Sequence, residues 1–121
     1  GDAAFKIMEK FQLLERECLD SNLVDRDAVK EFNIARNALL DSLNWMLKVR
    51  NMNDRYAGAT AFLRAFSTVL GAYYLLKVAQ KSQDIERIEL AHFYIYHILP
   101  EVYGDTKSAC RGSQSLYSVK L

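Results

Sequence analysis

The sequence predicts an all-α protein, an up-and-down bundle of four main helices followed by a short C-terminal helix. The chain has 121 residues, half of them hydrophobic, with only one proline and five glycines. This composition favours long helices joined by few turns. Apolar residues recur at steps of three and four through most of the chain, which places them on one face of an α-helix. The length suits one domain with one core, so residues 1–121 are expected to form a single helical domain.

The first half of the chain predicts two helices. The first runs to about Leu19, because its apolar residues share one face: Ala4, Ile7, Phe11, Leu14 and Cys18. A polar turn follows, in which the carboxylate of Asp25 or Asp27 can accept a hydrogen bond from a free amide of the next helix. The second helix then extends to about Arg50.

The second predicted helix carries two apolar stripes. The main stripe consists of Val29, Phe32, Leu39, Leu43 and Met46. At about 100° per residue, the second stripe falls on nearly the opposite side and consists of Ile34, Ala38, Trp45 and Val49. Because an apolar stripe that faces away from the core usually marks an interface, these four residues are the candidate interface, with Trp45 at a contact surface.

A third helix is expected from Asn53 or Asp54 to Ser82, and it is apolar almost all the way round. Its uncharged run from Ala65 to Leu76 has twelve residues, fewer than the roughly twenty that span a membrane. The sequence therefore predicts a helix that packs inside a bundle, with no membrane span. Small residues on one side would let a neighbouring helix approach closely, and that side carries Ala57, Thr60, Arg64, Ser67 and Gly71.

Arg64 lies in the middle of this expected close contact. A buried guanidinium without a partner is strongly unfavourable, so Arg64 is predicted to be a structural residue that pairs with a carboxylate or with helix-end carbonyls. Removing it from a dry site would destabilise the fold by about 3 to 5 kcal/mol. Gly71 is expected to be structural as well, as a point of close helix approach.

The fourth helix is expected to begin after a cap at Ser82 or Asp84. Its apolar repeat consists of Ile85, Ile88, His92, Ile95, Leu99 and Val102. Pro100 should end or kink it near Leu99, because proline donates no amide hydrogen and its ring presses on the carbonyl four residues earlier. A short last helix is expected within Lys107–Tyr117.

Charge and cysteine content exclude several classes of partner. With 16 basic and 15 acidic residues the net charge is +1, and no face is basic enough to predict binding of nucleic acid or of an anionic membrane. Cys18 and Cys110 are too few for a disulfide framework, and the charged N-terminus does not look like a signal peptide. A cytoplasmic location is expected. Because the chain begins with Gly1, we also expect it to be an excised piece of a longer protein.

The sequence contains few candidates for chemistry. Glu89 and His92 match the Glu-x-x-His unit of di-iron bundles, but His97 has Tyr94 three residues before it, so the second such unit is missing. His92 is therefore expected to be a hydrogen-bonded core residue that holds no metal. A phosphotransfer histidine is disfavoured by the aromatic residues that follow. The aromatic set could stack on a flavin or line an acyl pocket, but core packing is the favoured interpretation; it consists of Tyr73, Tyr74, Phe93, Tyr94 and Tyr96.

The last two long helices resemble the extra C-terminal helical domain of long acyl-CoA dehydrogenases, the kind named for acetyl-CoA dehydrogenase. The matching positions of the third helix are Ala59, Phe62, Leu63, Arg64 and Gly71. Those of the fourth are Ala91, Phe93, Tyr94, Leu99 and Pro100. The detailed likeness extends from Tyr56 to about Val102 and rests on packing residues, so Pro100 is expected to be structural.

The resemblance implies a parent enzyme that binds FAD and oxidises acyl-CoA thioesters, as in fatty acid metabolism. It assigns no catalytic, cofactor-binding or metal-binding residue to this chain, so the domain itself is expected to be non-catalytic and to hold no cofactor. Its partner would be the dehydrogenase body, with a homo-oligomer as a further expectation. The alternative is a stand-alone helical module for dimerisation or protein–protein interaction.

Overall fold

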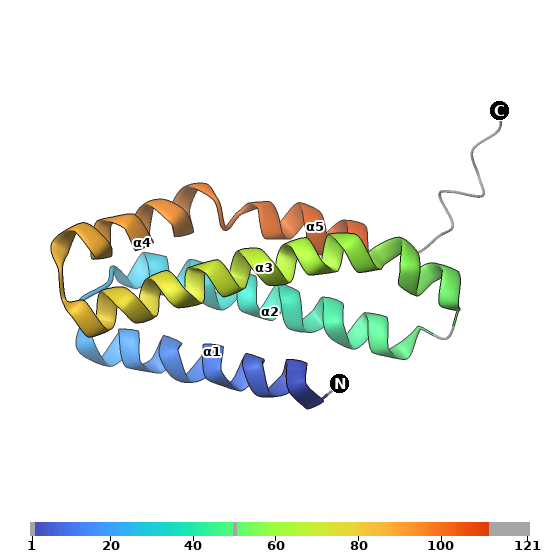
Figure 1. Ribbon diagram of the computed structural model, residues 1–121, viewed down its shortest axis with the longest axis horizontal. Helices are drawn as coiled ribbons and strands as arrows, with labels where there is room; N and C mark the ends of the chain where they lie inside the picture. Colours follow the sequence, from blue (N-terminus) through green and yellow to red (C-terminus); the bar gives the residue numbers. More distant parts are fainter. Residues whose placement is uncertain (1, 50, 112–121) are drawn as a thin grey trace.

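The protein is described here by a computed structural model that covers residues 2–49 and 51–111. Over these residues it is all-α, as predicted, and has five helices. They are α1 (Asp2–Ser21), α2 (Arg26–Lys48), α3 (Met52–Ser82), α4 (Ile85–His97) and α5 (Glu101–Ala109). The first four alternate in direction, and α5 continues in the direction of α4 (Figure 1). α4 and α5 together therefore occupy the fourth position of the bundle.

The start of α3 is fixed by a side-chain cap. The Asn51 side-chain oxygen accepts hydrogen bonds from the amides of Asn53 and Asp54, at 2.8 and 3.4 Å, and so satisfies two donors that have no partner within the helix. The helix begins at Met52, slightly before the predicted start at Asn53 or Asp54. It ends at Ser82, and the C-cap Gln83 has a left-handed φ of 55°, a common way for a helix to stop.

Pro100 separates α4 from α5. α4 ends at His97, and the amides of Ile98 and Leu99 both donate to the Tyr94 carbonyl, each at 2.9 Å. Pro100 then stands as the N-cap of α5, where its missing amide hydrogen leaves no helical hydrogen bond unmade. A break near Leu99 was expected on this ground.

The C-terminal helix lies earlier than predicted. α5 covers Glu101–Ala109, so Val102 belongs to it and not to the helix before Pro100. The prediction of a last helix over Lys107–Tyr117 is wrong about where that helix begins, and its second half lies outside the described residues.

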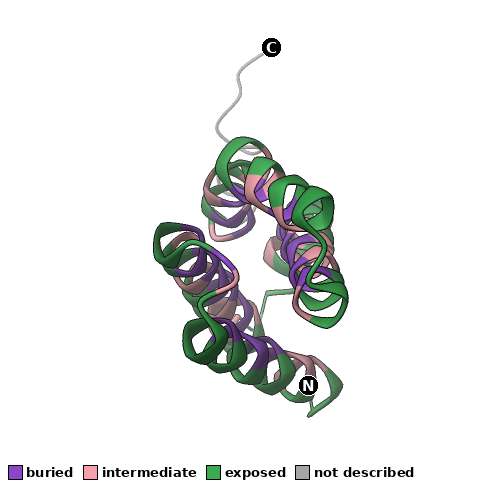
Figure 2. Ribbon diagram, turned by 90° about the vertical axis from the view of Figure 1, so that its left-hand side faces the viewer, coloured by how far each residue is buried: buried purple, intermediate pink, exposed green. Residues whose placement is uncertain are grey.

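The core lies between the helices of the bundle, with α3 at its centre. α3 contacts each of the other four helices, and buried residues line the inward sides of all of them (Figure 2). The Phe11 ring of α1 lies 6.1 Å from that of Phe32, 6.3 Å from that of Phe66 and 5.1 Å from that of Tyr73, measured between ring centroids. This aromatic cluster ties α1, α2 and α3 together.

α3 approaches α5 closely at Gly58. A Cβ atom added there would collide with the carbonyl oxygen of Ala109. Ala61 and Ala65, on the same side of α3, are buried. The side of α3 that packs closely is therefore the row of Gly58, Ala61 and Ala65. The row expected from the sequence is wrong except at Gly71, because the structure leaves four of its members exposed: Ala57, Thr60, Arg64 and Ser67.

The apolar character of α3 exceeds what its packing buries. By length and composition alone it could cross a membrane, so the twelve-residue uncharged run understates how apolar the helix is. Only 33% of its most apolar 18-residue window is buried in the structure, even though α3 is the central helix. Much of its apolar surface therefore faces outward.

Candidate functional site

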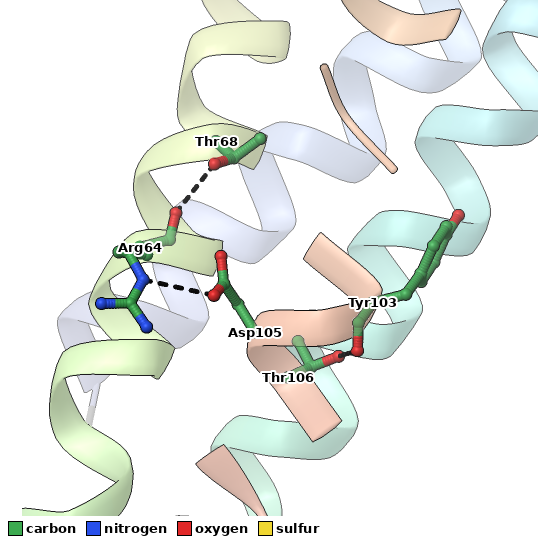
Figure 3. A network of polar contacts seen from close by, with 5 residues as sticks. All are labelled: Arg64, Thr68, Tyr103, Asp105 and Thr106. Carbon is green, nitrogen blue, oxygen red and sulfur yellow. Dashed lines mark hydrogen bonds and ion pairs between the residues drawn. The ribbon is translucent and has the colours of Figure 1, made fainter. Parts of the chain in front are cut away.

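Arg64 pairs with Asp105 on the outer side of the α3–α5 contact. Its Nε donates to Asp105 Oδ1 at 3.2 Å, and the Thr68 hydroxyl donates to the Arg64 carbonyl at 2.9 Å (Figure 3). The partner is a carboxylate from a neighbouring helix, but the Arg64 side chain is 61% exposed. The expectation that Arg64 lies in a dry site is wrong, because Ala61 and Ala65 take the inward positions.

Gly71 makes room for a side chain of α4. A Cβ atom at Gly71 would collide with the hydroxyl of Tyr94. That hydroxyl donates to the Thr68 carbonyl at 2.8 Å. Burial, with the nearby Glu101, raises the pKa of Tyr94 above its usual value, so the phenol keeps the proton that this hydrogen bond needs. The structure therefore places Gly71 at a packing point between α3 and α4.

His92 joins α4 to the beginning of α2. Its Nε2 accepts a hydrogen bond from the Asp25 amide at 3.0 Å, and its Nδ1 lies 3.7 Å from Asp25 Oδ2. Asp25 is the N-cap of α2, but its own side chain makes no capping hydrogen bond. The hydrogen bond expected of His92 is confirmed, but its side chain is 20% exposed, so the imidazole is less buried than its place between Ile88 and Ile95 indicated. Position 92 lies at the edge of the buried stripe, where it can reach the loop before α2.

The predicted interface on α2 is only partly open to solvent. Ile34 is 41% exposed, whereas Ala38, Trp45 and Val49 are half-buried. All four residues are therefore at least partly accessible on the surface of α2.

The aromatic set does not act as one core cluster. Tyr73 is buried and Tyr94 is half-buried, but Tyr74, Phe93 and Tyr96 are 57%, 56% and 39% exposed. For these three residues the interpretation as core is wrong.

A buried ion pair joins α1 to α2, and the sequence analysis missed it. Arg36 Nε donates to Glu15 Oε2 at 3.1 Å, and each side chain is only 10% exposed. The signal was present in the spacing. Glu15 lies four residues after Phe11, and Arg36 lies four residues after Phe32, so both charges occupy stripe positions on their helices.

Two cysteines lie in different surroundings, and neither forms a disulfide. Cys18 of α1 is buried, and Cys110 just after α5 is half-buried. Burial, with smaller contributions from Glu17 and Glu15, raises the pKa of the Cys18 thiol to about 12. A thiol of this kind is inert, since the thiolate is the reactive species.

Two of the surface hollows, both beside α3, contain a single basic side chain each, whereas a hollow of about 310 Å³ between α1 and α3 is lined by Lys10 and Lys77. An open hollow of about 410 Å³ between α3 and α5 contains Arg64 as its one basic residue, beside Glu101 and Asp105. A hollow of about 290 Å³ at the α2–α3 end is lined mainly by apolar side chains and by Arg55. The Arg55 guanidinium donates to the carbonyls of Leu47 and Val49. Over residues 2–49 and 51–111, no group of three or more metal-ligating side chains comes together.

Comparison with known proteins identifies the family. The family described as acetyl-CoA dehydrogenase C-terminal like matches residues 16–120, from the last turns of α1 through α5 and beyond. No curated protein and no solved structure matches the chain. The match covers most of the chain and includes the two helices that carry the sequence resemblance. The chain therefore belongs to the acetyl-CoA dehydrogenase C-terminal-like family.

Proposed function

We propose that this chain is the non-catalytic accessory domain of an FAD-dependent acyl-CoA dehydrogenase, which oxidises acyl-CoA thioesters to 2-enoyl-CoA. The family match over residues 16–120 carries the proposal. In this account FAD and the catalytic base belong to the dehydrogenase body, and the role of the helical domain is packing and assembly.

The charge of the α3–α5 hollow disfavours a nucleotide there. Phosphate groups of FAD or CoA are bound by several basic side chains or by a helix N-terminus. In the α3–α5 hollow Arg64 is already bound to Asp105, and Glu101 adds a second carboxylate. Such a surface repels a phosphate more than it attracts one.

We place the contact with the dehydrogenase body on the α2 stripe of Ile34, Ala38, Trp45 and Val49. This stripe faces away from the main buried side of α2, and Trp45 supplies a large apolar surface there. The cytoplasm is the proposed location, in agreement with the free thiols of Cys18 and Cys110.

The test compares three proteins: the full gene product, the same product without this domain, and the 121-residue chain alone. The proposal predicts that the full product is yellow, absorbs as a flavoprotein and dehydrogenates acyl-CoA. The product without the domain should keep flavin chemistry but change in assembly or stability. The chain alone should bind no FAD. Stoichiometric FAD in the isolated chain, or acyl-CoA turnover by it, would contradict the proposal.

Trp45→Ala in the full product tests the docking surface. It should weaken the association with the body or lower the thermal stability of the whole, whereas Ile85→Ala, at a 69% exposed position on α4, should change neither. If both variants behave like the unaltered protein, the α2 stripe is not the docking surface.

A second candidate is a stand-alone module for self-association, and the exposed apolar face of α3 favours it. The two candidates are distinguished by the gene: a flavin-binding dehydrogenase sequence upstream of Gly1 supports the accessory domain, and a methionine start at this point supports the module.

A further inference from the structure

α3 carries an uncharged row of side chains on its outward face along most of its length. We name this row the outer stripe; its members are Met52, Tyr56, Thr60, Leu63, Ser67, Leu70, Tyr74 and Val78. They follow one another at steps of four and three, so they lie on one side of the helix. Leu70 is half-buried, and all the others are exposed.

The outer stripe is unusual for a solvent-facing helix side. A surface helix normally places charged and polar residues opposite its buried face. Here Tyr56 is 70% exposed, Leu63 61% and Tyr74 57%. Exposed apolar side chains gathered in a continuous row mark an interaction site more often than they mark free surface.

The spacing of the outer stripe is symmetric about the level of Ala65. From either end the steps are four, four, three, four, three, four and four. If a second α3 lay against it in the opposite direction, the pairs would be Met52 with Val78, Tyr56 with Tyr74, Thr60 with Leu70, and Leu63 with Ser67. Each leucine would then face a small residue, and the tyrosines would face each other.

We propose that the outer stripe is the interface between two copies of this chain, in which the α3 helices lie antiparallel with a two-fold axis near Ala65. Such an interface is isologous and needs one self-complementary surface. The symmetric alternation of large and small residues in the outer stripe is what this geometry requires.

The charges support a second copy as the occupant. Near a two-fold axis a charged residue faces its own counterpart, and like charges across an interface are strongly unfavourable. None of the eight stripe residues is charged. Arg64, at the rim, is already bound to Asp105 at 3.2 Å.

The shape of the surface also supports it. Thr60, Leu63 and Ser67 line the open hollow of about 410 Å³ between α3 and α5. In the antiparallel arrangement the leucines of the second copy face the two small residues, so they can fill space that is open in the single chain.

The outer stripe alone supplies about half the area of a standard interface. The 27 residues from Met52 to Val78 extend about 40 Å, and a helix side about 10 Å wide gives about 400 Å² per copy. A standard interface buries about 800 Å² per partner, so neighbouring side chains of α1 and α5 have to contribute as well. Leu13 of α1, 58% exposed, is one such residue.

This inference goes beyond the proposed accessory function and does not depend on it. It concerns the 121-residue chain itself, whereas the accessory function concerns a dehydrogenase body. Dimerisation could fail while the flavin experiment succeeds. Equally, the chain could dimerise while the flavin experiment fails, so the two proposals are tested separately.

Sedimentation equilibrium of the purified chain tests the interface. The unaltered chain should be in a monomer–dimer equilibrium at micromolar concentration. Leu63→Glu places a carboxylate against Ser67 of the second copy and should raise the dimer dissociation constant by roughly 100-fold or more, since each copy then buries a charge without a partner in the interface. Leu90→Glu is the matched control, because Leu90 is an exposed leucine of α4, 51% exposed; it should leave the equilibrium unchanged. Circular dichroism verifies that both variants are folded.

Disulfide trapping tests the antiparallel register. In a Cys110→Ser background, a chain with Tyr56→Cys is mixed with a chain with Tyr74→Cys and oxidised. The proposed pairing predicts disulfides between the two kinds of chain, whereas a parallel pair would join like with like.

Several results would overturn the proposal. One is that the unaltered chain stays monomeric at about 100 micromolar, a concentration at which a specific interface should form dimers. Another is that the Leu63→Glu variant dimerises as well as the Leu90→Glu variant. A third is that trapping gives disulfides only between two chains of the same kind. Co-flotation of a monomeric chain with neutral phosphatidylcholine vesicles would assign the outer stripe to a membrane surface and would also reject the dimer.

Discussion

Two contacts between helices, α1 with α2 and α3 with α5, each contain an arginine–carboxylate pair, and the two pairs lie in opposite environments. Arg36 and Glu15 are each 10% exposed, whereas Arg64 is 61% exposed and Asp105 20%. The distances between the paired atoms are nearly equal, 3.1 and 3.2 Å. Ion-pair geometry therefore does not explain the difference.

The difference follows from how closely the helices approach. The backbones of α3 and α5 meet closely, and Gly58 leaves no room even for a Cβ atom beside Ala109. No arginine fits inside such a contact, so Arg64 is held outside. At the α1–α2 contact large side chains meet, and the rings of Phe11 and Phe32 lie with their centroids 6.1 Å apart. That spacing leaves space for a guanidinium and a carboxylate between the helices.

The largest expected effect is in the reactivity of the buried Cys18 thiol of α1. With its pKa raised to about 12 from 9.0, Cys18 has a thiolate fraction at pH 8 roughly 1,000-fold below that of an ordinary thiol. Labelling with a disulfide reagent should therefore modify one thiol quickly, Cys110, and Cys18 only after unfolding. Rapid labelling of both thiols in the folded chain would show that the α1–α2 contact opens readily.

The same pKa shift predicts a loss of stability in alkali. Below pH 9 the Cys18 thiol is protonated in both the folded and the unfolded chain. Between pH 9 and about 12 only the unfolded chain loses this proton, so stability falls as the pH rises through that window. Urea unfolding of Cys18→Ala should show a weaker pH dependence there than the unaltered chain, and equal slopes would contradict the shift.

Arg36→Met should destabilise the fold by about 3 to 5 kcal/mol, because it leaves the Glu15 carboxylate buried without its partner. Urea unfolding at pH 7 measures the loss. The control is Arg36→Met together with Glu15→Leu, which removes both charges and should recover most of the stability. If the double variant is as unstable as the single one, packing and not charge is responsible.

Gly58→Ala should cost about 1 to 3 kcal/mol, the range for overpacking a tight contact, because the new methyl group meets the backbone of α5. Gly104→Ala is its matched control within the same pair of helices. Nothing lies within 4 Å of a Cβ atom at Gly104, so alanine there should stabilise α5 by about 0.5 to 1 kcal/mol. Thermal unfolding of both variants decides the matter, and opposite signs are expected.

Arg64→Met should change stability by about 1 kcal/mol or less, as is usual for exposed ion pairs. If Arg64 were buried, the same substitution would lower the free energy of unfolding by about 3 to 5 kcal/mol. Raising the salt concentration should reduce even this small effect, whereas a loss above about 2 kcal/mol would mean that Arg64 is more enclosed than the structure shows.

The sequence was sufficient for the helices but not for their relative rotation. Apolar period predicted the four long segments, and the chemistry of proline predicted the break before Pro100. Of the predicted caps, Asp84 accepts a capping hydrogen bond, whereas the predicted capping hydrogen bond of Asp25 is absent. The side of α3 that meets α5 was predicted wrongly, because alanine and glycine at Gly58, Ala61 and Ala65 look neutral in an apolar pattern. Their role appears only when the backbone of α5 is in place.

The candidate residues show the same limit. The carboxylate partner of Arg64 was predicted in kind but not by position, since Asp105 is 41 residues away. The hydrogen bond from the Asp25 amide to His92, across 67 residues, could not be read from local spacing. The Glu15–Arg36 ion pair could have been predicted. Each charge lies four residues after a buried phenylalanine, and a buried charge needs a partner of opposite sign.

The most direct measurement of whether helix spacing decides which pair is buried is a double-mutant cycle on each pair, made in one buffer at pH 7. For Arg36 and Glu15, a coupling energy of about 2 kcal/mol or more is expected, and for Arg64 and Asp105 one below about 1 kcal/mol. Equal coupling energies, or a larger value for Arg64 and Asp105, would contradict the account.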